Sequence, residues 1–296
     1  MKQNKTRAPW APGDVLSLLF PQRCPFCDGA LPFRARLNVP LTQSGPADPW
    51  IHPRCFPQDI LLREPLCMKC GRSLGETGGA FCRDCRERSF HFKQNRAVWQ
   101  YTEPARSAVT RFKYHGRQQY AVYFARAWLA ANREYLEQIR PDVLIPVPIH
   151  RPRLRKRGYN QASLLAYELE KLTGIPCRED LVIRTKHTGA QKDLGPAERL
   201  RNMENAFRLK KPPEGIARVL IIDDIFTTGS TLETLSRLLL DAGVPEVYSA
   251  TLCVAGDDTY VVGADVSSAR HLLFNENKNE KEELHVRYAK PQTAPS

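Results

Sequence analysis

Residues 218–231 read Arg-Val-Leu-Ile-Ile-Asp-Asp-Ile-Phe-Thr-Thr-Gly-Ser-Thr, and this stretch decides the fold. Its four apolar residues, Val219 to Ile222, predict a short buried strand in a parallel sheet that is covered on both faces. Two carboxylates, Asp223 and Asp224, stand where this strand must end. A loop of small residues follows, then leucines recur at helical spacing, and Gly243 ends the predicted helix. We call Asp223 and Asp224 the acidic pair.

The loop after the acidic pair suits a phosphate group. It consists of Thr227, Thr228, Gly229, Ser230 and Thr231, and we call it the phosphate loop. Small residues that open a helix offer unpaired N–H groups and the positive end of the helix dipole to an anion. Two adjacent carboxylates can accept hydrogen bonds from vicinal hydroxyls or hold a hydrated Mg²⁺. The alternative is an ordinary N-capped turn, but a cap needs neither the acidic pair nor five small residues. We therefore expect a sugar 5-phosphate here, with its ribose diol over the acidic pair.

The same stretch resembles the phosphoribosyl pyrophosphate (PRPP) loop of type I phosphoribosyltransferases. The pattern of four apolar residues, two acids, two variable residues and Thr-Thr-Gly-x-Thr is matched at every position. The resemblance implies that Asp223 and Asp224 bind the ribose hydroxyls and are the candidate catalytic residues. It also implies that Thr227 to Thr231 bind the 5-phosphate.

Length and composition are those of a globular protein. The chain has 296 residues, of which 42% are hydrophobic and 26% charged, enough for one large domain and one small one. The sequence contains no apolar run near the ~18–20 residues of a membrane span. Pro12, Gly13 and Asp14 interrupt the basic start, so we expect a cytoplasmic protein. The net charge of +12 allows a polyanionic partner, either a nucleic acid or a phosphate-rich small molecule.

Cysteines near the start of the chain indicate metal sites. Seven of the nine cysteines lie between Cys24 and Cys85, mostly in Cys-x-x-Cys pairs, which without a secretion signal favours metal over disulfides. Eight candidate ligands suit two tetrahedral, structural zinc ions. The simplest pairing makes a first metal group of Cys24, Cys27, His52 and Cys55 and a second of Cys67, Cys70, Cys82 and Cys85. Interleaved pairing is the alternative. An isolated histidine is more often structural, but the spacing of His52 to Cys55 favours a ligand.

The rest of the chain predicts an α/β domain. Strands are expected at 98–101, 142–148, 181–184, 206–209, 219–222 and 247–254, and helices at 10–20, 105–113, 117–138, 160–172 and after the phosphate loop. Strands that alternate with helices indicate a parallel sheet with ligands at the carboxyl ends of its strands. We expect a double zinc-ribbon module at 14–93, an α/β domain at 94–255 and a partly disordered tail at 256–296.

Four features together resemble the ComF family of competence-associated phosphoribosyltransferase-like proteins. They are the double zinc module, Phe112-Lys113-Tyr114, Pro146-Val147-Pro148-Ile149-His150 with Arg-Gly-Tyr-Asn-Gln at 157–161, and Gln191-x-x-Leu194 with Arg199 and Asn202. The resemblance implies a type I phosphoribosyltransferase parallel sheet with a small N-terminal zinc-ribbon module. It implies that His150 and Arg151 lie where pyrophosphate binds and that residues 186–202 form a mobile hood. It also implies that the protein supports either DNA uptake in natural transformation or nucleotide-related metabolism. The sequence departs from the family at His52, where cysteine is usual, in the long insertion 28–51 and in the tail.

The basic turn at 151–157 is chemically suited to a leaving pyrophosphate. Arginine makes bidentate contacts to phosphate, and Mg²⁺ would bridge the leaving group to the ribose diol. A transition state of oxocarbenium character needs positioning, charge neutralisation and exclusion of water, for which loop 186–202 is a candidate lid. The alternatives are a solvated basic turn and a plain surface loop. His150 and Tyr159 are further candidates for substrate contact.

Two functions are therefore expected from the sequence. The first is a Mg²⁺-dependent phosphoribosyltransferase-like protein that binds PRPP, whose acceptor the sequence does not reveal. The second is a non-catalytic competence factor that binds single-stranded DNA, with a regulatory or vestigial PRPP pocket and DNA-uptake proteins as further partners. Candidate DNA contacts are Arg151, Arg153, Arg155, Lys156 and Arg157 in the turn, Arg54, Lys69, Arg72, Arg83, Arg86 and Arg88 in the zinc module, and the aromatics Phe81 and Phe90.

Overall fold

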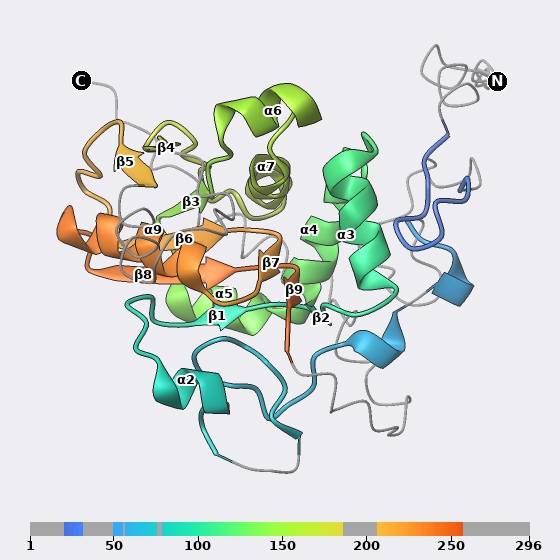
Figure 1. The fold of residues 1–296 in the computed structure, drawn as a ribbon, viewed down its shortest axis with the longest axis horizontal. Helices are drawn as coiled ribbons and strands as arrows, with labels where there is room; N and C mark the ends of the chain where they lie inside the picture. The colour runs from blue at the N-terminus through green and yellow to red at the C-terminus, as the bar shows by residue number, and fades with distance from the viewer. Residues whose placement is uncertain (1–20, 32–49, 56, 76–78, 186–205, 257–296) are drawn as a thin grey trace, which may run out of the picture.

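A parallel four-stranded sheet lies at the centre of the protein. The computed structural model describes residues 21–31, 50–55, 57–75, 79–185 and 206–256 (Figure 1). The order of the strands is β1-β8-β6-β3. Their bounds are Asn95–Arg96 for β1, Val143–Pro146 for β3, Arg218–Ile222 for β6 and Glu246–Ala250 for β8. The register between β3 and β6 ends with Pro146 opposite Ile222, so the residues that follow both strands emerge at the same edge.

A second set of parallel pairs continues this sheet beyond a break. It joins β2 (Trp99–Gln100), β9 (Cys253–Val254) and β7 (Ile225–Phe226) in that order. The predicted strand 247–254 is therefore interrupted at Thr251 and Leu252, and β6 is separated from β7 by the acidic pair. The interruption has a physical cause, because the backbone N–H groups of Leu252 and Cys253 both donate to the carbonyl oxygen of Asp224.

Helices cover both faces of the sheet, as the apolar strand residues predict. Residues Leu220 and Ile222 of β6 share a core with α3 (Ala105–Tyr114), α4 (Tyr120–Ala131), α5 (Arg133–Ile139) and α7 (Gln161–Thr173). The alternate residues Val219 and Ile221 share the other core with α9 (Ser230–Asp241). The carbonyls at the end of α9 receive the N–H groups of Gly243 and Val244, so this helix ends where the glycine predicts.

Two predicted segments have a different local structure. The single helix expected at 117–138 is wrong, because Asn132 leaves the helical region at φ −130° and separates α4 from α5. The expected basic turn is a short helix, α6 (Arg151–Arg157). Pro152 suits the first turn of this helix, and Gly158 ends it with φ +81°.

The predicted strands at 181–184 and 206–209 exist but do not join the central sheet. They form β4 (Val182–Arg184) and β5 (Phe207–Leu209), an antiparallel pair of their own. The expectation that they extend the parallel sheet is wrong. Several segments named in the sequence analysis lie outside the described residues. They are the predicted helix 10–20, most of the insertion 28–51, loop 186–202 with Gln191, Leu194, Arg199 and Asn202, and the tail after Gly256.

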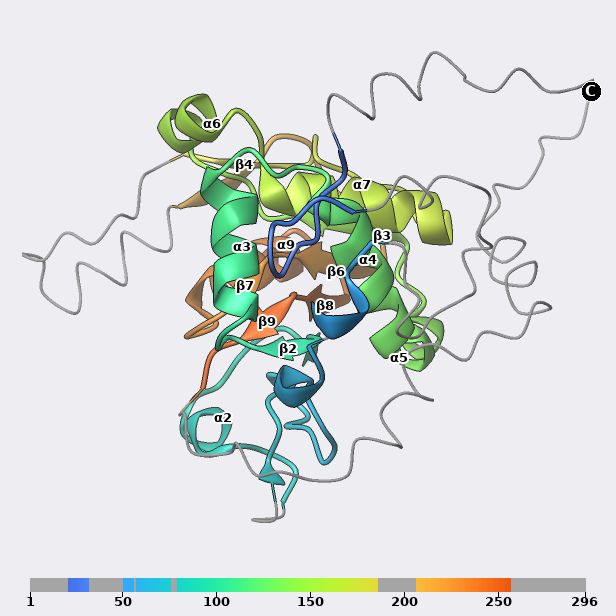
Figure 2. The ribbon, with the colours of Figure 1, turned by 90° about the vertical axis from the view of Figure 1, so that its right-hand side faces the viewer.

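The cysteine-rich part has only short elements: η2 (Pro53–Cys55), η3 (Gln58–Ile60) and α2 (Arg83–Glu87). Residues 21–31 lie against α3 and α4 (Figure 2), whereas α2 lies beyond the edge strands β1 and β2 of the two sheets (Figure 1). The boundary expected between residues 93 and 94 stays a prediction. Within the described ranges, no helix is both long and apolar enough to cross a bilayer.

Candidate ligand site and metal centres

The acidic pair lies in the break between β6 and β7. The backbone N–H of Asp223 donates to the carbonyl oxygen of Ala250 at 2.9 Å, and Asp224 accepts from Leu252 and Cys253 at 3.1 Å each. The N–H of Asp224 also donates to Oδ1 of Asp223 at 2.8 Å. These contacts fix the backbone of both residues and the carboxylate of Asp223 at the carboxyl edge of the sheet.

Lys113 completes this cluster, and the sequence analysis did not name it as a site residue. Its Nζ lies 2.8 Å from Oδ1 of Asp224, and both side chains are largely buried. Burial lowers the pKa of the Lys113 ammonium, but Asp224 and then Asp223 raise it above its usual value. The available signal was the Phe112-Lys113-Tyr114 motif, which marks the residue without revealing that α3 brings it to the acidic pair.

Burial and the neighbouring Asp224 raise the pKa of Asp223 to about 7, against the opposing effects of Lys113 and Arg184. Arg184 is a second residue that the sequence analysis missed, because its position in the predicted strand 181–184 does not reveal its proximity to Asp223. Burial and nearby Arg153 lower the pKa of its guanidinium, whereas Asp223 raises it. Arg184 therefore lies within electrostatic range of both the acidic pair and the basic helix α6.

The phosphate loop joins β7 to α9. Gly229 has φ +76°, and a Cβ there would lie 2.8 Å from a ring carbon of Phe226 and 2.8 Å from one of Phe90, so only glycine fits. The hydroxyls of Thr228 and Ser230 lie 2.6 Å apart. Thr227 and Thr228 are exposed. The loop thus presents small hydroxyl side chains and the start of α9 to a ligand.

The predicted pyrophosphate residues follow β3. His150 is the extended residue before α6, and Arg151 is the exposed first residue of that helix. Because Pro146 and Ile222 are opposite each other, His150 and Arg151 leave the sheet at the edge that carries the acidic pair. The structure therefore brings both residues to the strand edge that carries the candidate site.

Two residues after β3 have structural contacts instead. Tyr159 is buried and its hydroxyl donates to the carbonyl oxygen of Phe112, so it supports α3, and a substrate contact by this residue stays a prediction. Arg157 donates to Tyr114 and Gln161 at 2.8 and 2.9 Å and stacks on the Tyr114 ring. These contacts tie the end of α3 to the start of α7.

The first metal group comes together as the sequential pairing predicts. The ligand atoms of Cys24, Cys27, His52 and Cys55 all lie within 4.8 Å of one another. Cys27 Sγ lies 3.2 Å from Nδ1 of His52, close to the ~3.5 Å expected across a tetrahedral zinc with one sulfur and one nitrogen ligand. The other ring nitrogen, Nε2, lies 3.1 Å from the carbonyl oxygen of Ala30, the kind of contact that orients metal-bound histidines. The donor set fits zinc, and His52 is placed to serve as one of four ligands.

The second metal group is formed by cysteines alone. Cys67, Cys70, Cys82 and Cys85 also lie within 4.8 Å of one another, and the interleaved pairing is excluded. The sulfurs of Cys70 and Cys82 are 3.7 Å apart, and sulfurs ~2.3 Å from a tetrahedral zinc lie about 3.8 Å apart. Both groups can therefore hold structural zinc, with every ligand supplied by the chain.

The candidate DNA contacts of the zinc module divide into two sets. Arg54, Arg83, Arg86 and Arg88 are exposed, as is Phe81. Lys69, Arg72 and Phe90 instead make internal contacts: Lys69 donates to the carbonyl oxygen of Phe92, Arg72 to that of Ala255, and Phe90 packs on Phe226. These three residues are part of the fold.

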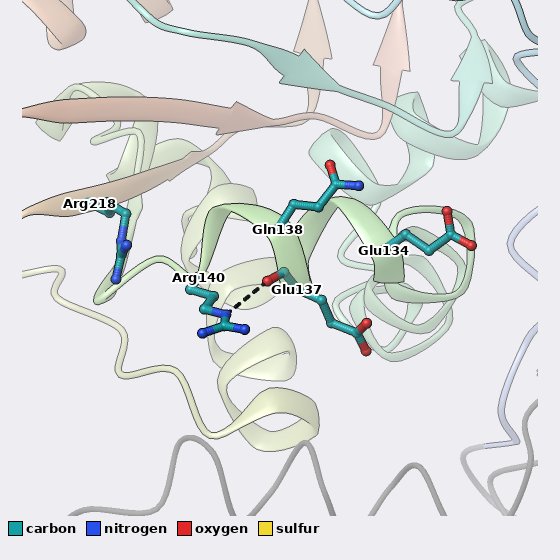
Figure 3. Close-up of a pocket in the computed structure, with 5 residues that line it drawn as sticks. All are labelled: Glu134, Glu137, Gln138, Arg140 and Arg218. Carbon is teal, nitrogen blue, oxygen red and sulfur yellow. Dashed lines mark hydrogen bonds between the residues drawn. The ribbon is translucent and has the colours of Figure 1, made fainter.

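A hollow of about 560 Å³ lies beside α5 and the start of β6 (Figure 3). It is lined by Glu134, Glu137, Gln138, Arg140 and Arg218. Arg218 begins β6, whereas Asp223 follows the end of that strand, so the hollow is at the opposite edge. Figure 3 shows one contact between its residues, from Nε of Arg140 to the carbonyl oxygen of Glu137 at 3.2 Å.

Comparison with known proteins identifies relatives over much of the chain. A family model described as "Phosphoribosyl transferase domain" matches residues 126–287, beyond the domain end expected at residue 255. "Competence protein F" of Haemophilus influenzae is 35% identical over 188 residues, which cover 62% of this chain and 82% of the relative. "DNA utilization protein YhgH" of Salmonella typhi is 32% identical over 200 residues, covering 66% and 86%. "Competence protein ComFC" of Bacillus subtilis is 32% identical over 197 residues, covering 63% and 77%.

Proposed function

The chain belongs to the phosphoribosyltransferase domain family, within the ComF group of competence and DNA-utilization proteins, and from this premise we propose that it binds PRPP together with Mg²⁺. The proposed ligand site consists of the acidic pair, the phosphate loop and the residues that follow β3. The observation that carries the proposal is the position of Asp223 and Asp224, fixed between the sheet edge and the loop.

Each part of the site has a distinct task in this proposal. The acidic pair accepts hydrogen bonds from the ribose diol, and the phosphate loop receives the 5-phosphate at the start of α9. His150 and Arg151 supply positive or polar contacts to the pyrophosphate at the neighbouring strand end. Two adjacent carboxylates with a raised pKa at Asp223 suit a cation, and Mg²⁺ would supply neutralisation of the pyrophosphate charge.

Calorimetry with PRPP and Mg²⁺ tests the site. We expect micromolar binding, about −7 to −8 kcal/mol, and at least a hundredfold loss, about 3 kcal/mol, in the D223N/D224N variant. The control is Asp241→Asn, which changes an exposed carboxylate at the far end of the same helix α9. Equal affinity of the wild type and D223N/D224N would refute the site assignment.

Turnover is a separate question from binding. Incubation with PRPP and pooled nucleobases or amines, followed by mass spectrometry, identifies any ribosylated product. Release of pyrophosphate without such a product would leave hydrolysis or ligand sensing.

A role in DNA handling is the second candidate function. It is favoured by the relatives' names and by the exposed Arg83, Arg86 and Arg88 on and beside α2. We propose sequence-independent binding of single-stranded DNA with a steep dependence on salt. A gel-shift series should show weaker binding when these three arginines are changed to Gln while PRPP binding is kept. Absence of DNA binding at low salt would rule out this role.

A further inference from the structure

The second metal group is connected to the phosphate loop through a short series of contacts. The first link begins at Lys69, which lies between Cys67 and Cys70. Its Nζ donates to the carbonyl oxygens of Phe92 at 2.8 Å and Phe90 at 3.4 Å. The cysteine knuckle therefore holds the backbone of residues 90–92 directly.

The same knuckle is also fixed to the start of the sheet. The N–H of Asn95 donates to the carbonyl oxygen of Lys69 at 2.7 Å, and the Asn95 side chain donates to that of Cys70 at 2.9 Å. Gly71 has φ +76°, and a Cβ there would come within 2.7 Å of the Asn95 carbonyl oxygen. Residues 90–95 are thus held along their length by the metal-binding knuckle.

The second link is the packing of Phe90 on the phosphate loop. Rings of Phe90 and Phe226 both approach Gly229 closely enough to exclude a Cβ, and the two ring centroids are 6.2 Å apart. One ring comes from the segment that leaves the second metal group, and the other from β7. The glycine of the loop is therefore held between the two.

The third link is a hydrogen-bonded carboxylate in the first turn of α9. The backbone N–H of His91 donates to Oε2 of Glu233 at 2.6 Å, and its ring Nδ1 donates to Oε1. Arg237 Nε lies 3.3 Å from the same Oε1. A carboxylate left free in this turn would compete with a phosphate for the positive end of the helix dipole. The His91 contacts therefore hold both the position and the charge of Glu233.

We propose that Phe90 and His91 are positioning residues for the phosphate loop, through which zinc in the second metal group and a sugar phosphate at the loop stabilise each other. The identity of the ligand rests on the proposed function, whereas the link between metal group and loop does not. Zinc binding supplies folding free energy to its module, and a loop ordered in advance binds its ligand more tightly. Thermodynamic linkage makes the effect reciprocal, so ligand at the loop must also strengthen retention of zinc.

The affinity for zinc, measured by competition with a chromogenic chelator, tests the reciprocal effect. In the wild type, PRPP with Mg²⁺ should raise the affinity for one zinc ion by about fivefold or more, the usual lower range of such couplings. In Phe90→Ala and His91→Ala this increase should fall below about twofold on the same scale. His91→Asn keeps a donor at the position of Nδ1 and should restore much of the effect.

The control variant is Glu87→Gln, on α2 of the same ribbon, where the side chain is exposed and paired with Arg83. It should behave as the wild type. An equal increase in zinc affinity in the wild type, Phe90→Ala and His91→Ala would overturn the coupling, because the contacts would then not transmit it.

A ligand-free measurement keeps the inference independent of PRPP. Hydrogen exchange of the amides at 229–234 should become about tenfold faster in His91→Ala and Phe90→Ala, and after loss of the second zinc in Cys85→Ser, while α7 amides are unchanged. If calorimetry shows no PRPP binding, the proposed function fails and this exchange result still decides the positioning role. Unchanged exchange at 229–234 in all three variants would overturn it.

Discussion

The two metal groups belong to the cores on opposite faces of the sheet, and they are held there by different chemistry. Cys24 of the first group lies in the core formed with α3, α4 and α7. Cys67, Cys70 and Cys82 of the second lie in the core formed with α9. The first group has one histidine ligand and an exposed Cys27, whereas three of the four cysteines of the second are buried.

The first group docks on the helices through side chains. Asp28 receives two hydrogen bonds from Arg117 at 2.8 Å each and one from the Tyr120 hydroxyl. Arg111 donates to the carbonyl oxygen of Phe26 at 2.6 Å, and the Phe26 ring packs edge-on against Trp99. At the second group, the side chains of Lys69 and Asn95 likewise donate to backbone carbonyl oxygens, so the ion pair of Asp28 with Arg117 is what distinguishes the two docking contacts.

The difference shows what each group supports. Arg111 lies on α3, two residues before Lys113, so the first group braces the helix that brings a cation to Asp224. The second group braces the phosphate loop through Phe90 and His91. The two halves of the predicted zinc-ribbon module thus pack into the cores on opposite faces of the sheet.

The largest effect is expected from substitutions that remove a cysteine ligand of the second metal group. Cys67→Ser or Cys82→Ser should lose zinc-linked folding free energy on the order of 10 kcal/mol and unfold this ribbon. Elemental analysis should show zinc falling from about two ions per chain to about one. Cys177→Ser, outside both groups, is the control and should keep both ions. Full zinc content in Cys67→Ser would contradict the assignment.

The histidine of the first group gives the next largest effect. His52→Ala removes one of four ligands and should weaken zinc there by at least a hundredfold, since even outer contacts are worth about 10–100-fold. His52→Cys restores a four-ligand set and should recover binding. Competition with a zinc chelator measures both affinities, with the second group as internal reference. A first-group affinity unchanged by His52→Ala would remove this histidine from the ligand set.

A smaller effect is expected at the docking contact of the first group. Asp28→Asn should cost about 2 kcal/mol, less than the 3–5 kcal/mol of a fully buried pair because both side chains are about a quarter exposed. Burial raises the pKa of Asp28, but the hydrogen bonds from Arg117 and Tyr120 outweigh it and hold the pKa below its usual value.

The sign of the pH dependence follows from this lowered pKa. The contribution of Asp28 is present above the pKa of the unfolded state, ~3.9, and is lost as the pH falls through the lower folded value. Urea unfolding should therefore separate the wild type from Asp28→Asn near neutral pH and not in strong acid. The exposed Asp59→Asn is the matched control in the same module. A difference that persists unchanged in strong acid would contradict the ion pair as its source.

The sequence predicted the parts of the molecule that local spacing encodes. The acidic pair, the glycine of the phosphate loop and the cysteine ligands each follow from residues near one another in the chain. Lys113 and Arg184 were missed because only tertiary packing brings them to Asp223 and Asp224. The break in strand 247–254 was missed for the same reason. It depends on hydrogen bonds from Leu252 and Cys253 to Asp224, which follows a different strand. The placement of β4 and β5 outside the main sheet is likewise a matter of pairing, which periodicity does not encode.

The smallest expected effect concerns the pH dependence of ligand binding at the site that both groups support. Burial and Asp224 raise the pKa of Asp223 to about 7, and a protonated Asp223 is a poorer acceptor for a sugar diol. As the pH rises towards 7, PRPP affinity should therefore increase by up to about tenfold per pH unit, and above pH 7 it should level off.

Asp223→Asn provides the comparison for this effect, because the titration of the ligand's own phosphates is common to both proteins. The difference in affinity between the wild type and Asp223→Asn, measured by calorimetry from about pH 5.5 to about pH 8.5, should grow with pH and reach a plateau. The sign for folding is the reverse of that at Asp28: a raised pKa favours the folded state at low pH, and this contribution is lost as the pH rises through about 7. The two acids thus give opposite pH signatures, one at the docking contact of the first group and one at the ligand site. A difference in PRPP affinity that stays constant with pH would show that the charge of Asp223 does not control binding.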